Sequence, residues 1–401
     1  VGLGRGAGAV SRLSQIEGTD IIALCDLNPE RIANSQKTLK SSGRKEAIVY
    51  SGEEDWKKMC ERDDIDLIYN ATPWELHVPI ALYAMNHGKH VAIEVPAALT
   101  IKDCWALVDK AEEKQLHCMM LENCCYDFFE LATLNMARKG VLGEIIHTEG
   151  AYIHDLRQEK FDGYYKHWRL EYSKYHTGNP YPTHGLGPIA QILGINQGDR
   201  MEYLSSVSTN QYGLALYAKD KLKNDERITQ SERYMLGDMN TTIIRTSKGK
   251  SIMIQHDTTS PRPYSRIHLV QGTNGMAVKY PDEKVALQPS SHEFLKEGDQ
   301  KELLSKYEHP LSKYIGEKAK KVGGHGGMDF IMDWRLIYCL QNGYPLDQSV
   351  YDAAAWSSIV ELSERSVQNK STSVAIPDFT RGAWENYQPW PVIDMEKTLH
   401  G

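Results

Sequence analysis

The chain has 401 residues, enough for two or three domains with buried cores. Its formal net charge is −7, which excludes the basic surplus expected of a nucleic-acid or anionic-membrane binder. Although 41% of the residues are hydrophobic, no apolar run approaches the roughly 20 residues needed to span a bilayer. We therefore predict a globular protein with no membrane span and no nucleic-acid partner.

In chain order, apolar strands first alternate with amphipathic helices. Strands are predicted over 20–26, 47–50, 65–72, 90–95 and 118–123. Helices are predicted between these strands: before residue 18, over 28–40, between 50 and 65, from after residue 72 to residue 86, and over 100–115. This alternation predicts a parallel, doubly wound Rossmann sheet.

The pattern changes after Cys125. One helix is predicted over 128–140, followed by longer strands of alternating character over 143–154, 201–210, 240–249, 251–258 and 266–275. Such strands predict an open, mainly antiparallel sheet. Helices are predicted again over 328–341 and 350–367, before a tail with proline and tryptophan. We expect a Rossmann domain over 1–124 and an open-sheet α+β domain over 125–401.

The first residues carry a glycine motif that predicts a dinucleotide site. Gly2 and Gly4 permit a tight turn and close approach of a pyrophosphate, and the next helix offers free N–H groups. Asp26 ends a strand about 20 residues later, where its carboxylate can bind the ribose 2′-hydroxyl. Because a carboxylate repels a 2′-phosphate, the predicted cofactor is NAD rather than NADP.

Three later strands end in polar or aromatic segments, "NATPWELH", "EVPA" and "ENCCY". Open parallel sheets bind ligands at the carboxyl ends of their strands. The residues expected to contact NAD are Gly2, Gly4, Arg5, Gly6, Asp26, Trp74, Glu75, His77, Glu94, Val95 and Asn123. For Glu94 and Glu122, the alternative is that they only cap the segments that follow.

The start at Val1, already inside the glycine motif, indicates a truncated sequence that has lost any export signal. Localisation is therefore unknown, with export to the periplasm and a cytoplasmic location both open. The seven cysteines form no CxxC pair, and their odd number and apolar surroundings predict buried free thiols. His154 and Asp155 have no third ligand at a recognisable spacing, so we predict no metal.

The Rossmann layout, the segment "TPWELHVPIALYAMNHGKHVAIEVP" and the C-terminal sheet resemble the Gfo/Idh/MocA oxidoreductases over nearly the whole chain. Dehydrogenases of that family carry Glu-Lys-Pro after the fifth strand, where the lysine helps to move a substrate proton. This chain has Glu94-Val95-Pro96, and valine carries no proton. The motifs "EVP", "ENCCY", "GAYIHDLR", "HWR" and "YPTHGLGP" resemble glycoside hydrolase family 109 more specifically, the NAD-dependent α-N-acetylgalactosaminidases.

That resemblance implies site residues in the second half. Tyr181 and His184, in the loop 175–188, would contact both cofactor and sugar, while Tyr152, Arg169 and Tyr264 would bind the sugar. His184 precedes an apolar helix whose dipole favours neutral imidazole, as a general base requires. The alternative is that these tyrosines pack and the histidine is structural.

The resemblance also implies a redox-neutral cleavage by tightly bound NAD. Hydride leaves C3 of the sugar while His184 removes the C3 hydroxyl proton, and Tyr152 then abstracts the acidified C2 proton. The leaving group departs by C1–C2 elimination, water adds, and hydride returns to C3. Because a phenol has an unperturbed pKa of about 10, Tyr152 would need a cation such as Arg169.

Several alternatives stay open. The chain could instead be an NAD-dependent sugar or cyclitol dehydrogenase that releases NADH, or a non-catalytic protein that binds NAD or sugar. The glycines around His325 predict either an active-site loop or a simple connection. The expected partner is a small-molecule glycoside of unspecified anomer, and a homo-oligomer is neither predicted nor excluded.

Overall fold

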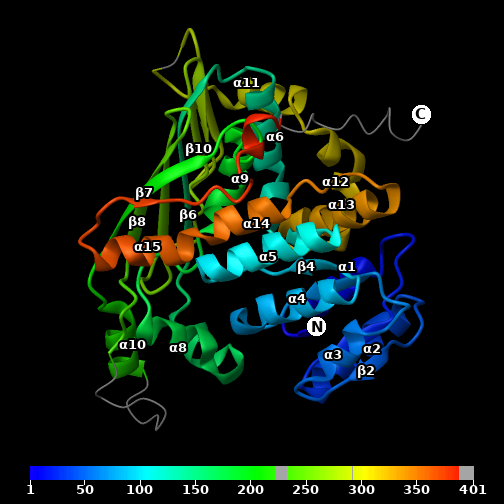
Figure 1. Cartoon of the computed structure of the whole chain (residues 1–401). Helices are drawn as coiled ribbons and strands as arrows, with labels where there is room; N and C mark the ends of the chain where they lie inside the picture. Colours follow the sequence, from blue (N-terminus) through cyan, green and yellow to red (C-terminus); the bar gives the residue numbers. More distant parts are fainter. Residues whose placement is uncertain (222–232, 291, 388–401) are drawn as a thin grey trace. The chain divides into compact units, whose positions relative to one another are not determined.

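A computed structural model describes residues 1–221, 233–290 and 292–387 (Figure 1). They divide into two compact units. Unit 1 comprises Val1–Asn135 and Glu308–Ser357, and unit 2 comprises Met136–Tyr307 and the described residues from Ser358 onward. Unit 1 thus includes a late segment that the sequence analysis assigned to the C-terminal domain. Most of the predicted proline- and tryptophan-containing tail lies outside the described residues.

The strands of unit 1 are short and parallel, as predicted. β1 (Ala23–Cys25) pairs with β2 (Ile48–Tyr50), and β3 (Leu67–Asn70), β4 (His90–Ile93) and β5 (Cys118–Met120) form a second sheet in that order. The backbone of Val1 and Gly2 lies between β1 and β3. The Gly2 N–H donates to the Cys25 carbonyl at 2.8 Å, and the Ala71 N–H donates to the Val1 carbonyl at 2.9 Å.

The helices of unit 1 are α1 (Gly6–Leu13), α2 (Pro29–Ser41), α3 (Asp55–Cys60), α4 (His77–Asn86), α5 (Ile101–Lys114), α12 (Pro310–Val322), α13 (Met328–Asn342) and α14 (Val350–Ser357). Local chemistry sets where two of them begin. Asn28 caps α2 by accepting from the N–H groups of the first turn, and Thr100 caps α5 in the same way. α6 (Phe128–Arg138) carries the chain from unit 1 into unit 2.

Unit 2 is built on one eight-stranded sheet (Figure 1). Its strand order is β12 (Lys284–Leu287), β11 (Gly275–Val278), β10 (Leu269–Gly272), β6 (Ile145–Ile153), β9 (Ser251–Asp257), β8 (Asn240–Thr246), β7 (Met201–Ser208) and β13 (Val374–Ala375). Only β6 and β9 run parallel, and every other neighbouring pair is antiparallel. The predicted open, mainly antiparallel sheet is therefore confirmed.

The helices of unit 2 are α7 (Arg157–Asp162), α8 (Trp168–Tyr175), α9 (Thr183–Leu193), α10 (Gly213–Lys221), α11 (Glu297–Lys306) and α15 (Ile359–Gln368). α9 packs on β6 and α15 packs on β7. In β8, Thr242 and Ile244 are buried whereas Ile243 and Arg245 are exposed. This alternation shows that helices cover one face of this part of the sheet, as its sequence pattern requires.

Two expectations from composition can be compared with the structure. All seven cysteines are buried free thiols, as predicted: Cys25, Cys60, Cys104, Cys118, Cys124, Cys125 and Cys339. Among the described residues, no helix combines the length and the apolar character needed to cross a membrane.

Candidate active site

The glycine loop of unit 1 has the backbone shape of a dinucleotide cradle. Gly2 adopts a φ of +81°, and a Cβ atom there would lie 2.5 Å from the Ala71 carbonyl oxygen, so only glycine fits. The loop leads directly into α1, which begins at Gly6 and presents its first N–H groups to the loop. A side chain at Gly4 would come within 3.3 Å of the Arg31 guanidinium. These residues can hold a pyrophosphate at the helix N-terminus.

Asp26 lies at the carboxyl end of β1, beside this loop. Its carboxylate accepts hydrogen bonds from the Leu3 N–H at 2.5 Å and the Asn28 N–H at 2.7 Å. The Arg31 guanidinium lies 3.9 Å away. The carboxylate therefore fixes the loop, and it stands where a Rossmann fold binds the adenosine ribose. The loop and this carboxylate fit NAD.

Trp74 and His77 fasten the segment after β3 to the segment after β4. The Trp74 indole N–H donates to the Val95 carbonyl at 3.2 Å. The His77 ring nitrogens lie 2.8 Å from the Pro96 carbonyl oxygen and 2.9 Å from the Thr72 carbonyl oxygen. Glu75, between them, is exposed. Both rings thus shape the sheet edge, and a direct contact of either with NAD stays a prediction.

Val95 occupies the position where related dehydrogenases carry lysine. Its side chain is 3% exposed, and a charged amine buried there without a counter-charge would be costly. The edge of β4 therefore supplies no proton carrier at this residue.

A charged network connects the glycine loop to α13. Arg5 forms an ion pair with Glu94 at 3.1 Å and with Asp329 at 3.4 Å. Asp329 also accepts from the Asn123 amide at 2.5 Å and faces Nδ1 of His325 at 2.9 Å. Burial alone would raise the pKa of Asp329, but the hydrogen bond with His325 and the charge of Arg5 lower it below its usual range. The carboxylate is ionised and orients the exposed His325 imidazole, which could then carry a proton.

A second carboxylate, Asp333, lies one turn further along α13 and is fully buried. Arg12 donates to it at 2.6 Å and the Tyr69 hydroxyl donates at 3.1 Å. Burial raises the pKa of Asp333 to about 6, even though the Arg12 charge acts in the opposite direction. The pair ties α1, behind the glycine loop, to α13.

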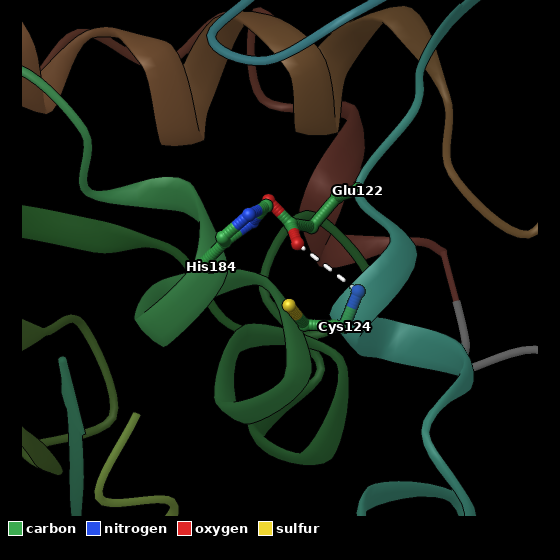
Figure 2. A group of neighbouring side chains, drawn as sticks. All are labelled: Glu122, Cys124 and His184. Carbon is green, nitrogen blue, oxygen red and sulfur yellow. Dashed lines mark hydrogen bonds between the residues drawn. The ribbon is translucent and has the colours of Figure 1, made fainter. Parts of the chain in front are cut away.

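Glu122 caps the short 3-10 helix Asn123–Tyr126. Its carboxylate accepts a hydrogen bond from the Cys124 N–H at 3.1 Å (Figure 2). The side chain is buried, and its backbone carbonyl accepts from the Gln348 amide at 3.0 Å. The capping alternative considered for this residue agrees with these contacts. Glu94, in contrast, pairs with Arg5.

Unit 2 gathers the predicted sugar-binding tyrosines around one histidine. The Tyr152 ring centroid lies 4.7 Å from that of Tyr181 and 5.3 Å from that of His184, while Tyr181 and His184 are 4.9 Å apart. Tyr152 and His184 are half-buried, whereas Tyr181 is buried. His184 lies in the first turn of α9 (Figure 2). A phenol and an imidazole thus lie side by side, both reachable by a ligand.

Close backbone contact between Gly150 of β6 and Gly185 of α9 brings the side chains of Tyr152 and His184 together. A Cβ atom on Gly150 of β6 would overlap the Gly185 carbonyl, and one on Gly185 would overlap the Ala151 N–H. The helix can therefore approach the strand this closely only because both residues are glycine. Gly150 lies two residues before Tyr152, and Gly185 directly follows His184. The close contact of the two glycines therefore sets the distance between these two proposed proton carriers.

The loop before α9 is braced against α15. Glu364 accepts from the Thr177 N–H at 3.1 Å and faces His176 at 3.0 Å, and the Asn179 N–H donates to Ser363 at 2.8 Å. Gly178 has a φ of +80°, and a Cβ atom there would lie 2.6 Å from the Glu364 nitrogen. These contacts explain why so short a span carries so many glycines and prolines: the loop is held rigid so that Tyr181 and His184 keep their places.

Arg169 and Tyr264 complete the cluster. The Arg169 guanidinium lies 4.9 Å from the Tyr181 ring centroid and 4.7 Å from that of Tyr164. Burial alone would lower the pKa of Arg169, but the surrounding tyrosines raise it. Tyr264 lies 6.3 Å from Tyr152, and its hydroxyl accepts from Arg266 at 3.1 Å. All five residues predicted to act on the sugar in this unit are neighbours.

His154 and Asp155 are arranged differently from a metal site. The Asp155 carboxylate is occupied by Arg157, which donates to it at 2.9 Å and 2.8 Å. The His154 ring packs against Tyr264, with centroids 5.2 Å apart. These contacts place His154 and Asp155 at the edge of the tyrosine cluster.

Sequence reasoning missed other groups near the two sites. In unit 1 these are Asp329 and Asp333, and in unit 2 they are Lys160 and His256, both buried. His256 of β9 is the register partner of Tyr152 on β6, and their ring centroids lie 6.3 Å apart. Only the parallel pairing of β6 with β9 reveals this neighbour, and no local motif signals it.

Comparison with known proteins covers both units of the chain. Residues 1–122 match the oxidoreductase family with an NAD-binding Rossmann fold, and residues 126–386 match the C-terminal domain of glycosyl hydrolase 109. The chain is 54% identical to an alpha-N-acetylgalactosaminidase of Bacteroides fragilis, over 96% of this chain and 92% of that protein. It is 50% identical to a glycosyl hydrolase family 109 protein of Porphyromonas gingivalis, over 96% and 84% of the two chains.

Solved structures show the same fold at low identity. Levoglucosan dehydrogenase in complex with NADH and L-sorbose superposes with a TM-score of 0.69 at 18% identity, over 94% of this chain and 98% of that chain. Scyllo-inositol dehydrogenase from Lactobacillus casei, with bound NAD(H) and scyllo-inositol, superposes with a TM-score of 0.64 at 12% identity, over 92% and 96%.

The glycine cradle, Asp26 and the open-sheet unit define an NAD-binding protein of the Gfo/Idh/MocA fold. Within it, the chain belongs to glycosyl hydrolase family 109. It is an NAD-dependent glycosidase, as the sequence motifs predicted.

Proposed function

We propose that the protein hydrolyses α-N-acetylgalactosaminides, with Tyr152 and His184 as its proton carriers. The observation that supports this most is their side-by-side placement in the tyrosine cluster, where Tyr181 contacts both the phenol and the imidazole. The substrate follows the name of the 54% identical relative, an alpha-N-acetylgalactosaminidase.

The glycine loop and Asp26 would hold NAD, which would supply a hydride acceptor for C3 of the sugar and the same hydride for its return, so that no outside oxidant would be consumed. His184 takes the C3 hydroxyl proton, because Val95 leaves no amine for this task. The C3 carbonyl then acidifies the C2 hydrogen, and Tyr152 removes that proton. The bond from C1 to the leaving-group oxygen breaks as the C1–C2 double bond forms. The hydroxyl of water adds at C1, the remaining proton of that water goes to the leaving-group oxygen, and the Tyr152 phenol returns its proton to C2. His184 gives its proton back to the C3 oxygen when the hydride returns to C3.

Arg169 supports the phenol of Tyr152 in this scheme. A cation near a phenol favours its anionic form, and the guanidinium is held over the Tyr181 ring, next to Tyr152. Tyr264 closes the cluster and offers an aromatic face to the sugar. The proposed cofactor contacts of Tyr181 and His184 belong to the same scheme.

The experiment is to incubate the protein with p-nitrophenyl α-N-acetylgalactosaminide and to follow nitrophenolate and NADH together, without and with added NAD. We expect nitrophenolate release without accumulating NADH. The His184→Ala variant should form neither nitrophenolate nor NADH, because the C3 hydroxyl of the sugar keeps its proton. Stoichiometric NADH without nitrophenolate would contradict the proposal and indicate a dehydrogenase.

We also propose that the chain forms a homo-oligomer through the outer face of its sheet. Tyr203, Val207 and Ile243 are 40%, 58% and 56% exposed and point to the same side of β7 and β8. Adjacent apolar side chains of this kind mark association surfaces. Sedimentation velocity should show a larger species for the wild type than for Val207→Lys, and equal species would contradict this.

A further inference from the structure

Lys160 of α7 is a buried amine that the scheme above does not use. Its side chain is 4% exposed. Within the described ranges, no carboxylate forms an ion pair with it, and its hydrogen-bond partner is the Ser173 hydroxyl at 3.0 Å. Burying an amine without a counter-charge is costly, and an apolar residue would fill the same space at lower cost. A role beyond packing would account for its presence.

The hydrogen bonds of Ser173 connect this amine to Arg169. The Lys160 ammonium donates to the Ser173 hydroxyl, which in turn donates to the Arg169 carbonyl at 2.8 Å. The Ser173 carbonyl accepts from the Leu236 N–H at 3.1 Å, which fastens this turn of α8 from another side. The amine therefore holds the turn that directs the Arg169 guanidinium over Tyr181.

The charges around the amine are positive or neutral. Burial and the Arg169 charge lower the pKa of Lys160 to about 7. Burial, followed by the charges of Lys160 and Arg169, lowers the pKa of His256 well below its usual value. His256 is thus a neutral ring between this positive region and Tyr152, its register partner.

The ionisable groups that face Tyr152 come from every element packed around it. They are His154 of the same strand, His256 of β9, Tyr181 and His184 of the loop and α9, Tyr264, and Arg169 of α8. In this set, the phenols are the groups that can become anionic. A positive charge near a phenol favours its anionic form, because an opposite charge stabilises the ionised state.

We propose that Lys160 is a positioning residue of the reaction: through Ser173 it fixes Arg169, whose guanidinium favours the phenolate of Tyr152. This inference rests on the proposed function, because the phenolate is the base that removes the C2 proton. It assigns a reaction role to a residue that no sequence motif marks.

The test compares the wild type with Lys160→Met, whose side chain has similar length and no charge. Tyrosinate formation is followed by ultraviolet difference absorbance during a pH titration, without substrate. We expect one phenol of the wild type to ionise below the usual pKa of about 10, and to shift upward by about one unit in Lys160→Met. Lys174→Met is the matched control, since Lys174 lies on α8 but pairs with Glu171 at 2.7 Å.

Activity gives a second readout. The acid limb of the kcat/KM profile should move upward by about one unit in Lys160→Met, with about a tenfold loss at neutral pH that is recovered in alkali. A loss that pH does not restore would show a structural role only and would overturn the proposal. Superimposable tyrosinate titrations of the two proteins would overturn it as well.

If Lys160→Met fails to fold, Ser173→Ala decides, because it removes the hydroxyl that connects the amine to Arg169. A phenol that is absent in Tyr152→Phe and ionises at higher pH in Ser173→Ala than in the wild type supports the proposal, and an unchanged titration of that phenol contradicts it. Because these titrations need no substrate, they are independent of the proposed function. Absence of nitrophenolate release from the wild type would refute the glycosidase scheme but leave the titration result standing.

Discussion

At the scale of single residues, the two proposed proton carriers of unit 2 have different chemistry. His184 is an imidazole, and a neutral imidazole ring has one nitrogen that accepts a proton. Tyr152 is a phenol, and in the proposed scheme it depends on a nearby cation, the Arg169 guanidinium. The proposed roles follow: the imidazole serves the hydroxyl at C3, and the phenolate serves the less acidic hydrogen at C2.

Replacement of Tyr152 by phenylalanine should therefore separate the two half-reactions. His184 can still take the C3 hydroxyl proton, so reduced-cofactor absorbance should rise to at most one equivalent per protein. Nitrophenolate release should fall roughly 10²–10⁴-fold, since the C2 proton has no acceptor. Stopped-flow absorbance measures both signals. Tyr203→Phe, an exposed tyrosine of β7, is the control, and near-normal release from Tyr152→Phe would refute its role.

At the scale of elements, the crossing of α9 over β6 sets the geometry of the cluster. The strand and the helix approach through Gly150 and Gly185, neither of which needs a positive φ. Their requirement for glycine is thus one of space alone, and a single added methyl group must push the helix outward. Any such shift moves His184 relative to Tyr152.

Gly150→Ala should accordingly lower stability by about 1–3 kcal/mol, the usual cost of overpacking. It should also lower kcat while changing KM little, because the proposed proton carriers move apart while the sugar-binding surface remains. Thermal unfolding and steady-state kinetics test both effects. Gly298→Ala is the matched control: a Cβ atom there meets nothing within 4 Å, and alanine favours the α11 helix in which it lies. Equal behaviour of the two variants would contradict the argument.

At the scale of the whole chain, the return of residues 308–357 to unit 1 is the main feature of the topology. Arg12 and Asp333 are 321 positions apart and form a buried ion pair across this return. The pair holds α1, the helix that follows the glycine loop, against α13. The stability of unit 1 and the position of the helix behind the glycine loop therefore depend on the same contact.

Arg12→Met should lower the free energy of unfolding by about 3–5 kcal/mol, because it leaves a buried carboxylate without its cation. The folded-state pKa of Asp333, about 6, exceeds the unfolded value of about 4, so its contribution to stability falls as pH rises between them. The loss should thus be smaller at pH 5 than at pH 8, as Asp333 can bind a proton there.

Urea titration at the two pH values measures this difference. The double variant Arg12→Met/Asp333→Leu should recover much of the stability, which a double-mutant cycle quantifies. Arg62→Met, which breaks an exposed pair with Asp64, should leave the stability nearly unchanged. An Arg12 variant as stable as the wild type at both pH values would refute the role of the pair.

The features that could be predicted from the sequence all rest on short-range patterns. Alternating apolar segments indicated the parallel strands of unit 1, and period-two strands indicated the open sheet of unit 2. The spacing from Gly2 to Asp26 indicated NAD, and the motifs around Tyr152, Arg169 and His184 indicated the family. Periodicity and spacing are properties of neighbouring residues, so one chain suffices to read them.

The tertiary structure alone decided which distant residues meet. The contacts of Arg12 with Asp333, of Tyr152 with His256 and of Lys160 with Ser173 depend on strand register, helix crossings and the return of the chain to unit 1. None of these is encoded in a local period, because each is settled by how the apolar faces pack once the elements exist. Burial then changes the pKa of the groups so enclosed, and that chemistry has no counterpart in the unfolded chain.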